Sequence, residues 1–364
     1  MTNEQQQHWI KPGIRGLPAA DPFRVEAQRH RLQWNENPYE FPADLKEIVL
    51  ERLAQAGWAR YPLGLRPWSL IERIATYRGV RVDQVVAGPG SSDLIRLIMS
   101  SVLHPGDNVV LPSPTFLVYR PRIRMVQANS VDVPLAAQNN FALPVDAMIE
   151  AAEVNEARLV IVCAPNNPTG TIYSIEDLNL IAVGCPGLLL VDAAYSEFSG
   201  QDFTPLLAHD NVLLLHTFSK LYAMAGVRVG YVLTSAYLAG QLQKAVSDFP
   251  LSVFAEVTAE VALEHRDRFA APREQILHER DRLAAALNEI AGVHVYPSGT
   301  NFLLVDINRP RQPLIEHLLH EHSLLVSDLG AYPELGSCVR VSIGTPQQND
   351  LVLRGFREYL APSE

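Results

Sequence analysis

The stretch LLLHTFSKLYAMAGVRVGY, residues 213–231, joins two short apolar runs through a polar turn that contains Lys220. The first run is typical of a buried strand, and residues 221–225 after the lysine are again largely apolar. Desolvation disfavours the charged form of a lysine, so an amine in this position can lose its proton near neutral pH and attack a carbonyl carbon. Taken alone, a lysine at a strand end is far more often an exposed surface residue.

Further apolar runs on both sides of this stretch indicate an α/β fold. Between residues 82 and 249, short runs that are apolar throughout alternate with helical patterns, as in parallel α/β units whose sheet is covered on both faces. After residue 250 the pattern changes to long helices, expected at 254–265 and 268–290. The sequence predicts an N-terminal arm (1–34), a large domain (35–249) and a small α+β domain (250–364). The helix expected at 43–56 is a candidate to pack with the small domain.

Composition excludes several classes of partner. The net charge of -10 disfavours nucleic acid and anionic membranes, which require a basic surface. No apolar run approaches membrane-spanning length, and the first residues lack the pattern of a secretory signal. The three cysteines, Cys163, Cys185 and Cys338, are far apart and odd in number, which favours a reducing compartment over a disulfide framework. We therefore expect a cytoplasmic protein that binds small molecules.

Polar motifs follow the predicted strands, at the edge where open α/β sheets bind ligands. The first is GPGSSD, residues 88–93, which places Gly90, Ser91 and Ser92 at the start of a helix. Backbone N–H groups and hydroxyls at a helix N-terminus favour an anion such as phosphate. A plain turn with a serine cap is an equally good interpretation. The third glycine of the dinucleotide fingerprint is absent, which disfavours a nicotinamide cofactor.

Two further motifs carry an amide, a carboxylate and a phenol. In APNNPTG, residues 164–170, Asn167 can donate its amide to a ligand oxygen, or it can simply satisfy the turn. In VDAAYSEF, residues 191–198, Asp192 ends a buried strand, where a carboxylate is costly without a cationic partner. A protonated heterocyclic nitrogen would be such a partner, and an arginine or a helix N-terminus is the alternative. Tyr195 can place its phenol on the same ligand.

The remaining motifs contain arginines. Thr217, Ser219 and Arg228 surround Lys220 in the sequence and can hold a phosphate, because a guanidinium group forms two parallel hydrogen bonds to it. Arg340 lies within the apolar run CVRVSIG, residues 338–344, where a buried guanidinium needs an anion. That anion is either a substrate carboxylate or phosphate, or a structural carboxylate. For Arg228, a structural ion pair is the corresponding alternative.

At these residues the chain resembles the class I and II aminotransferases, which are pyridoxal 5'-phosphate (PLP) enzymes of fold type I. The resemblance depends on PNNPTG, VDAAY, TFSK and Arg228, whose order and spacing agree from the NENPY loop (35–39) to RVSIGT (340–345). It implies a large domain with a mainly parallel seven-stranded sheet flanked by helices, plus a smaller α+β domain.

The resemblance also implies a role for each site residue. Lys220 would bind the PLP aldehyde covalently and later act as the general base, while Asp192 would keep the pyridine nitrogen protonated. Asn167 and Tyr195 would bond the phenolic oxygen. The phosphate would lie among Gly90, Ser91, Ser92, Thr217, Ser219 and Arg228. Phe116 and Ala194 would cover the two ring faces, although ordinary core packing also explains Phe116.

Within this superfamily the chain is most similar to histidinol-phosphate aminotransferases, which exchange amino groups between histidinol phosphate and glutamate through 2-oxoglutarate. The likeness implies that Asn37 and Tyr39 lie at the substrate mouth and that Arg340 binds the substrate phosphate or the glutamate carboxylate. It also implies a homodimer in which Tyr61 reaches the neighbouring site.

One departure from the pattern keeps other functions open. Ser327 stands where those relatives usually carry an arginine, and losing a bidentate anion site could cost a few kcal/mol of binding to a phosphorylated substrate. An aromatic amino-acid aminotransferase and a threonine-phosphate decarboxylase, a lyase, therefore remain alternatives. A catalytically silent binding module of the same fold is disfavoured because Lys220 and Asp192 are both present.

Overall fold

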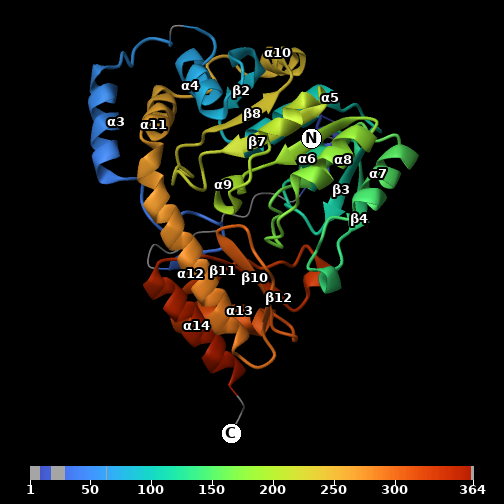
Figure 1. Ribbon diagram of the computed structural model, residues 1–364, viewed down its shortest axis with the longest axis vertical. Coiled ribbons are helices and arrows are strands. Elements are labelled where there is room, and N and C mark those ends of the chain that lie inside the picture. The colour runs from blue at the N-terminus through green and yellow to red at the C-terminus, as the bar shows by residue number, and fades with distance from the viewer. Residues whose placement is uncertain (1–8, 18–28, 63, 362–364) are drawn as a thin grey trace.

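The structure is a computed structural model that describes residues 9–17, 29–62 and 64–361. Its centre is a seven-stranded sheet in the order β2-β8-β7-β6-β5-β3-β4 (Figure 1). The strands are β2 (Val85–Gly88), β3 (Asn108–Ser113), β4 (Asn129–Pro134), β5 (Leu159–Cys163), β6 (Leu188–Asp192), β7 (Val212–Thr217) and β8 (Gly230–Thr234). β8 is antiparallel to both of its neighbours, and the other pairs are parallel. The predicted mainly parallel seven-stranded sheet is confirmed.

Helices bury both faces of this sheet, as the uniformly apolar strands predict. Along β6, Val191 enters one hydrophobic cluster and the adjacent Leu190 enters a second cluster on the other face. The first cluster includes residues of α4 (Trp68–Arg78), α7 (Val145–Val154) and α8 (Ile175–Gly184). The second includes residues of α5 (Ser91–Val102), α6 (Tyr119–Met125) and α10 (Ala236–Ala245). The central strands therefore lie in a dry core with their polar ends at its edge.

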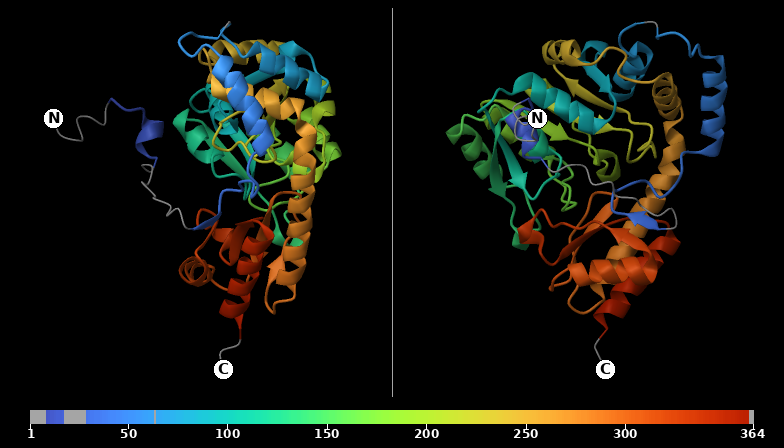
Figure 2. Two further views of the ribbon diagram at one scale, coloured as in Figure 1. Left: turned by 90° about the vertical axis from the view of Figure 1, so that its left-hand side faces the viewer. Right: turned by 180° about the vertical axis from the view of Figure 1, so that it is seen from behind.

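The C-terminal elements form a second body on one side of the sheet, as both views in Figure 2 show. They are α12 (Ala270–Asn288), β9 (His294–Val295), β10 (Phe302–Asp306), α13 (Gln312–His322), β11 (Leu324–Val326), β12 (Cys338–Ser342) and α14 (Pro346–Leu360). The preceding helix, α11 (Val253–Glu264), instead packs against α4 beside the large sheet (Figure 1). β9, β10 and β12 make an antiparallel sheet, and α12 runs along one side of the molecule towards α13 and α14 (Figure 1). α3 (Ala43–Gln55) packs against α11. The exact domain boundaries stay a prediction.

The strands β4 and β1 (His30–Leu32) are among the elements that the sequence patterns did not predict. β4 is an edge strand in which Val133 is the buried residue, so it lacks the apolar run that marks the other strands. The other strand, β1, pairs in parallel with β11 although the arm was expected to be simply extended. The described part of the arm also contains the short helix α2 (Pro12–Arg15), whose Gly13 lies against the backbone of α6. Because β1 has only three residues and pairs with β11, far away in the sequence, its own sequence shows no periodic pattern.

Two parts of the arm, residues 1–8 and 18–28, lie outside the described residues. Within the described residues, no helix is both long and apolar enough to cross a bilayer.

Candidate active site

The carboxyl ends of β5, β6 and β7 and the N-terminus of α5 surround a cavity of about 380 Å³. The strand register brings the motifs together, because Cys163 pairs with Asp192 and Thr217 pairs with Gly230. Most of the predicted site residues line this cavity, namely Ser91, Ser92, Phe116, Asn167, Asp192, Ala194, Tyr195, Thr217, Ser219, Lys220, Arg228 and Arg340. The volume is within the usual range of small-molecule sites.

Lys220 extends from the turn after β7, and its Nζ donates a hydrogen bond to the Trp34 carbonyl at 2.8 Å. The same Nζ lies 5.9 Å from the centre of the Tyr195 ring. Burial, followed by repulsion from Arg340, lowers the pKa of Lys220 to about 8. A substantial fraction of this amine is therefore neutral, and nucleophilic, near pH 8. The structure favours the reactive interpretation of Lys220 over that of an ordinary surface lysine.

Asp192 is buried, and among the described residues no arginine pairs with it. Its Oδ2 accepts a hydrogen bond from the Tyr119 hydroxyl at 2.8 Å, and its Oδ1 accepts one from the Ala194 backbone at 3.2 Å. Burial raises the pKa of Asp192 to about 6, although Tyr119, Ala194 and Lys220 lower it in part. A cationic ligand in the cavity would stabilise this carboxylate. Tyr119 was not singled out from the sequence, because it looks like a core residue of an amphipathic helix.

Arg340, Asn167 and Tyr195 form one connected polar group. Arg340 donates to Asn167 Oδ1 at 2.6 Å and to the Gln33 carbonyl, and Asn167 Nδ2 lies 3.3 Å from the Tyr195 hydroxyl. The Tyr195 hydroxyl also accepts from Asn35 Nδ2 at 2.9 Å. Asn35 gave no signal in the sequence beyond its place in a polar loop.

The structure bears on two of the alternatives that the sequence left open, those for Asn167 and Arg340. The turn is satisfied by Asn166, which bonds Pro114, Thr115 and Thr169, and this leaves Asn167 directed to Tyr195 and Arg340. No carboxylate of the described chain pairs with Arg340, whose buried Nε has no partner. Burial lowers the pKa of this guanidinium, although Tyr195 and Tyr332 counteract the effect. An anionic ligand would therefore be favourable beside Arg340.

The start of α5 offers a second anion-binding position. Its N-cap residue is Gly90, and no side chain of the described residues caps the helix, so the alternative of a plain turn with a serine cap is not borne out. A Cβ atom on Gly90 would lie 2.5 Å from Arg228 Nη2, and its φ of +88° also favours glycine. Arg228 donates to Ser219 Oγ at 3.4 Å and to the Ala225 carbonyl at 3.2 Å, and it has no ion pair within the described residues. Uncapped N–H groups, two serines and a guanidinium thus meet in one place.

Four predicted residues are not in the wall of this cavity: Gly90, which lies against Arg228 at the start of α5, and Asn37, Tyr39 and Tyr61. Asn37 and Tyr39 line an adjoining cavity of about 660 Å³, which shares Glu36, Ser219 and Ala225 with the first. Asn37 Nδ2 donates to the backbone carbonyls of Lys220 and Leu221, so its amide holds the lysine turn within the chain itself. Tyr61 is 78% exposed and stacks on Phe249. A single chain therefore does not bring Tyr61 to the site.

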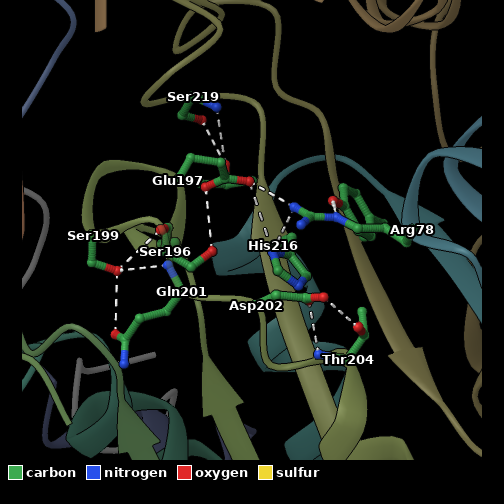
Figure 3. A network of polar contacts seen from close by, with 12 residues as sticks. Arg78, Ser196, Glu197, Ser199, Gln201, Asp202, Thr204, His216 and Ser219 are labelled. Atoms are coloured by element: carbon green, nitrogen blue, oxygen red, sulfur yellow. Dashed lines mark hydrogen bonds and ion pairs between the residues drawn. The ribbon is translucent and has the colours of Figure 1, made fainter. Parts of the chain in front are cut away.

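A buried ion pair supports the site from the opposite face of β7 (Figure 3). Arg78 donates to Glu197 Oε1 at 2.7 Å, to the Tyr231 hydroxyl at 2.7 Å and to His216 Nδ1 at 3.2 Å. His216 is buried and stacks on Tyr231, and burial together with the charge of Arg78 holds its pKa well below the usual value. Because Glu197 follows Tyr195 by two residues and His216 precedes Lys220 by four, this network fixes the two functional turns relative to each other.

Comparison with known proteins gives a consistent result across the chain. The family model described as aminotransferase class I and II matches residues 29–356. A histidinol-phosphate aminotransferase of Deinococcus radiodurans is 35% identical over 94% of both chains, and one of Chlorobium phaeobacteroides is 32% identical over 96% of this chain and 97% of the relative. The fold also matches a crystal structure of histidinol-phosphate aminotransferase from Sinorhizobium meliloti in complex with pyridoxal-5'-phosphate. The TM-score is 0.87 at 24% identity, over 96% of this chain and 97% of that one.

The raised pKa of Asp192 leads to a stability prediction for Asp192→Asn in the cofactor-free protein. A carboxyl whose pKa is higher in the folded than in the unfolded chain contributes stability below both values, and this is lost as the pH rises through about 6. The neutral asparagine has no such loss. We expect the variant to be more stable than wild type by roughly 1–3 kcal/mol at pH 7.5, and the difference to vanish below about pH 4, in denaturant unfolding.

The matched control is Asp281→Asn, because Asp281 is 70% exposed and should change stability by no more than about 0.5 kcal/mol. A pH-independent difference between Asp192→Asn and wild type would contradict the proposed burial of a charged carboxylate.

Removing one member of the buried ion pair should destabilise the fold strongly. Arg78 and Glu197 are 10% and 9% exposed, so Arg78→Ala leaves a buried carboxylate without its cation. We expect a loss of about 3–5 kcal/mol in chemical denaturation. The control Arg81→Ala removes an ion pair whose arginine is 72% exposed, and should cost less than about 1 kcal/mol. Equal losses in the two variants would show that the Arg78 network has no special role.

Proposed function

Because the chain belongs to the class I and II aminotransferases and is a PLP-dependent transaminase, we propose that it moves an amino group between histidinol phosphate and 2-oxoglutarate. The observation that carries this substrate assignment is the relation to histidinol-phosphate aminotransferases over nearly the whole of both chains. The family, the cofactor and the reaction type agree with the predictions made from the sequence.

The residues around the cavity fit PLP at each of its polar groups. The phosphate suits the cradle of Gly90 and Arg228 at the start of α5, where a side chain on residue 90 would occupy the space. The pyridine nitrogen suits Asp192, a buried carboxylate without a cationic side-chain partner in the described chain. The remaining proposed contacts are Ser91, Ser92, Thr217 and Ser219 to the phosphate, Asn167 and Tyr195 to the phenolic oxygen, and Phe116 and Ala194 to the ring faces.

When bound, PLP supplies an electron sink that stabilises negative charge at the substrate carbon. Asp192 would hold a proton on the pyridine nitrogen, because its carboxylate favours the cationic ring in a buried setting. Tyr119 would keep that carboxylate oriented through its hydrogen bond to Oδ2. These two residues would therefore set the protonation state on which the chemistry depends.

Lys220 would both anchor the cofactor and transfer the proton. Its lowered pKa leaves a neutral amine available to bond the aldehyde carbon. During the reaction, Nζ would act as the general base that carries a proton between substrate and cofactor. The Trp34 carbonyl, which accepts from Nζ, would help to keep the amine over the cavity.

The substrate anion would meet Arg340, whose unpartnered Nε lies buried in the cavity wall. Asn37 and Tyr39 would line the substrate path from the adjoining cavity. Ser327, which replaces the usual arginine, forms a backbone bridge with Arg340. We therefore expect weaker binding of the substrate phosphate than in relatives that carry both arginines.

We further propose a cytoplasmic homodimer in which Tyr61 contributes to the neighbouring site. The supporting observation is a group of exposed large apolar side chains, Trp58, Tyr61 and Leu65 before α4 and Trp68 at its first residue. All three cysteines are free and buried, in keeping with a reducing compartment.

An amino-donor screen tests the substrate assignment. Purified, PLP-loaded protein is incubated with 2-oxoglutarate and each of histidinol phosphate, histidinol, phenylalanine and tyrosine, and glutamate is measured. Because one anion–arginine contact is worth roughly tenfold or more in binding, we expect kcat/KM for histidinol phosphate to exceed that for the unphosphorylated amines by at least about tenfold.

Other outcomes would assign one of the alternatives. Faster turnover of aromatic amino acids would make the protein an aromatic aminotransferase, and carbon dioxide release from threonine phosphate alone would make it a decarboxylase. The control variant Lys220→Ala should keep its fold by circular dichroism but form no glutamate. Comparable activity in wild type and Lys220→Ala would overturn the mechanism.

A further inference from the structure

Three potential metal ligands converge on the C-terminal body, outside the cavity described above. They are His317 and His322 on α13 and Glu358 on α14, and one ligand atom of each lies within 4.8 Å of the others. Glu358 Oε2 is 2.9 Å from His322 Nε2 and 4.0 Å from His317 Nε2. We propose that these three side chains bind a divalent transition-metal ion, with Zn²⁺ as the best-matched probe.

The packing of α13 against α14 creates this cluster. His322 is the last residue of α13, and Gly355 of α14 lies beneath its ring. A Cβ atom at Gly355 would be 2.9 Å from His322 Cδ2 and 2.6 Å from Leu318 Cδ2, so a larger residue would push the imidazole away from α14. The His317 and His322 rings are 5.4 Å apart, in an edge-to-face arrangement. The two imidazoles are therefore held in place by the helix packing and are not free surface side chains.

An unsatisfied nitrogen, His317 Nε2, distinguishes this cluster from an ordinary ion pair. His322 and Glu358 already satisfy each other, but His317 Nε2 is buried and has no hydrogen-bond partner within the described part of the chain. Leaving a buried polar nitrogen unpaired is unfavourable, and such groups are uncommon in native proteins. A metal ion bound between the three residues would give His317 Nε2 its missing partner. A simple His322–Glu358 pair would leave it unexplained.

The ligand set and its dimensions suit Zn²⁺. Two imidazoles and one carboxylate are a recurrent zinc ligand set, and Zn–N and Zn–O bonds of about 2.0–2.2 Å in tetrahedral geometry place ligand atoms about 3.3 Å apart. The distances of 2.9 and 4.0 Å from Glu358 lie on either side of this value, so a small rotation of a half-exposed glutamate would equalise them. Mg²⁺ and Ca²⁺ prefer all-oxygen ligands and should bind poorly.

Such an ion would join the end of α13 to α14. The chain segment after α13 is linked to the cavity through the pairing of β11 with β1. β11 begins two residues after His322 and pairs with β1, and Gln33 and Trp34 follow β1 directly. The Gln33 carbonyl accepts from Arg340 and the Trp34 carbonyl accepts from Lys220. We therefore infer a stabilising role for the metal, with no part in the chemistry.

Calorimetry on the tag-free, full-length, PLP-loaded protein tests the site after treatment with a chelator. We expect one Zn²⁺ per chain, and a Tm that rises by roughly a few °C when the ion is in large excess over its Kd. His317→Ala and His322→Ala should each weaken binding by at least about tenfold and abolish the rise in Tm. Co²⁺ should give the visible absorption of a tetrahedral site in wild type but not in His317→Ala or His322→Ala, and Mg²⁺ should give no heat.

The matched control is His320→Ala, because His320 lies on the same helix but is exposed and outside the cluster. It should bind Zn²⁺ like wild type. The proposal is overturned if wild type binds no Zn²⁺, if His317→Ala and His322→Ala bind it undiminished, or if His320→Ala loses as much affinity as they do. Circular dichroism of each variant ensures that lost binding reflects a lost ligand in a folded protein.

Discussion

The site depends on three ionisable side chains, Lys220, Asp192 and Arg340, which lie around one cavity and form no direct ion pair within the described residues. In the described chain their hydrogen-bond partners are neutral: the Trp34 carbonyl, the Tyr119 hydroxyl, and Asn167 with the Gln33 carbonyl. Buried charges satisfied only by neutral groups are unfavourable, which is why the pKa of Lys220 falls and that of Asp192 rises. This imbalance favours a ligand with complementary charges, and PLP together with an anionic substrate supplies them.

The rest of the fold provides the stability that this arrangement lacks. On the opposite face of β7, Arg78 and Glu197 form a buried pair in which each charge has its counterpart. Gly230 also supports the site, because it lets α5 lie close to the sheet edge. A Cβ atom at this position would lie 2.9 Å from the Ser91 backbone nitrogen and would push α5 away. The ion pair of the supporting structure, Arg78 with Glu197, is therefore complete, whereas the ionisable side chains of the site lack such a direct partner in the described chain.

Much of this site could be predicted from sequence because its residues directly follow apolar runs. Asp192 is the last residue of a buried strand, Asn167 and Lys220 each follow one by a few residues, and parallel strands bring such positions to one edge. Tyr119 and Asn35 were not predicted, since their partners are 73 and 160 residues away and neither residue type, in its place, points to those partners. The same reasoning applies to β1 and β4, whose pairing is set by tertiary contacts and whose sequences carry no long apolar run.

The central claim is that the amine of Lys220 is made reactive by its surroundings, and the rate of covalent PLP attachment tests it most directly. The cofactor-free protein is mixed with PLP between pH 6 and 9.5, reduced with borohydride at timed intervals, and mapped by peptide mass spectrometry. Because only the neutral amine attacks, the account predicts labelling at Lys220 whose rate rises about tenfold per pH unit and levels off above a pH of about 8. Labelling at another lysine, or a rate that keeps rising to pH 9.5 as for an ordinary lysine, would contradict it.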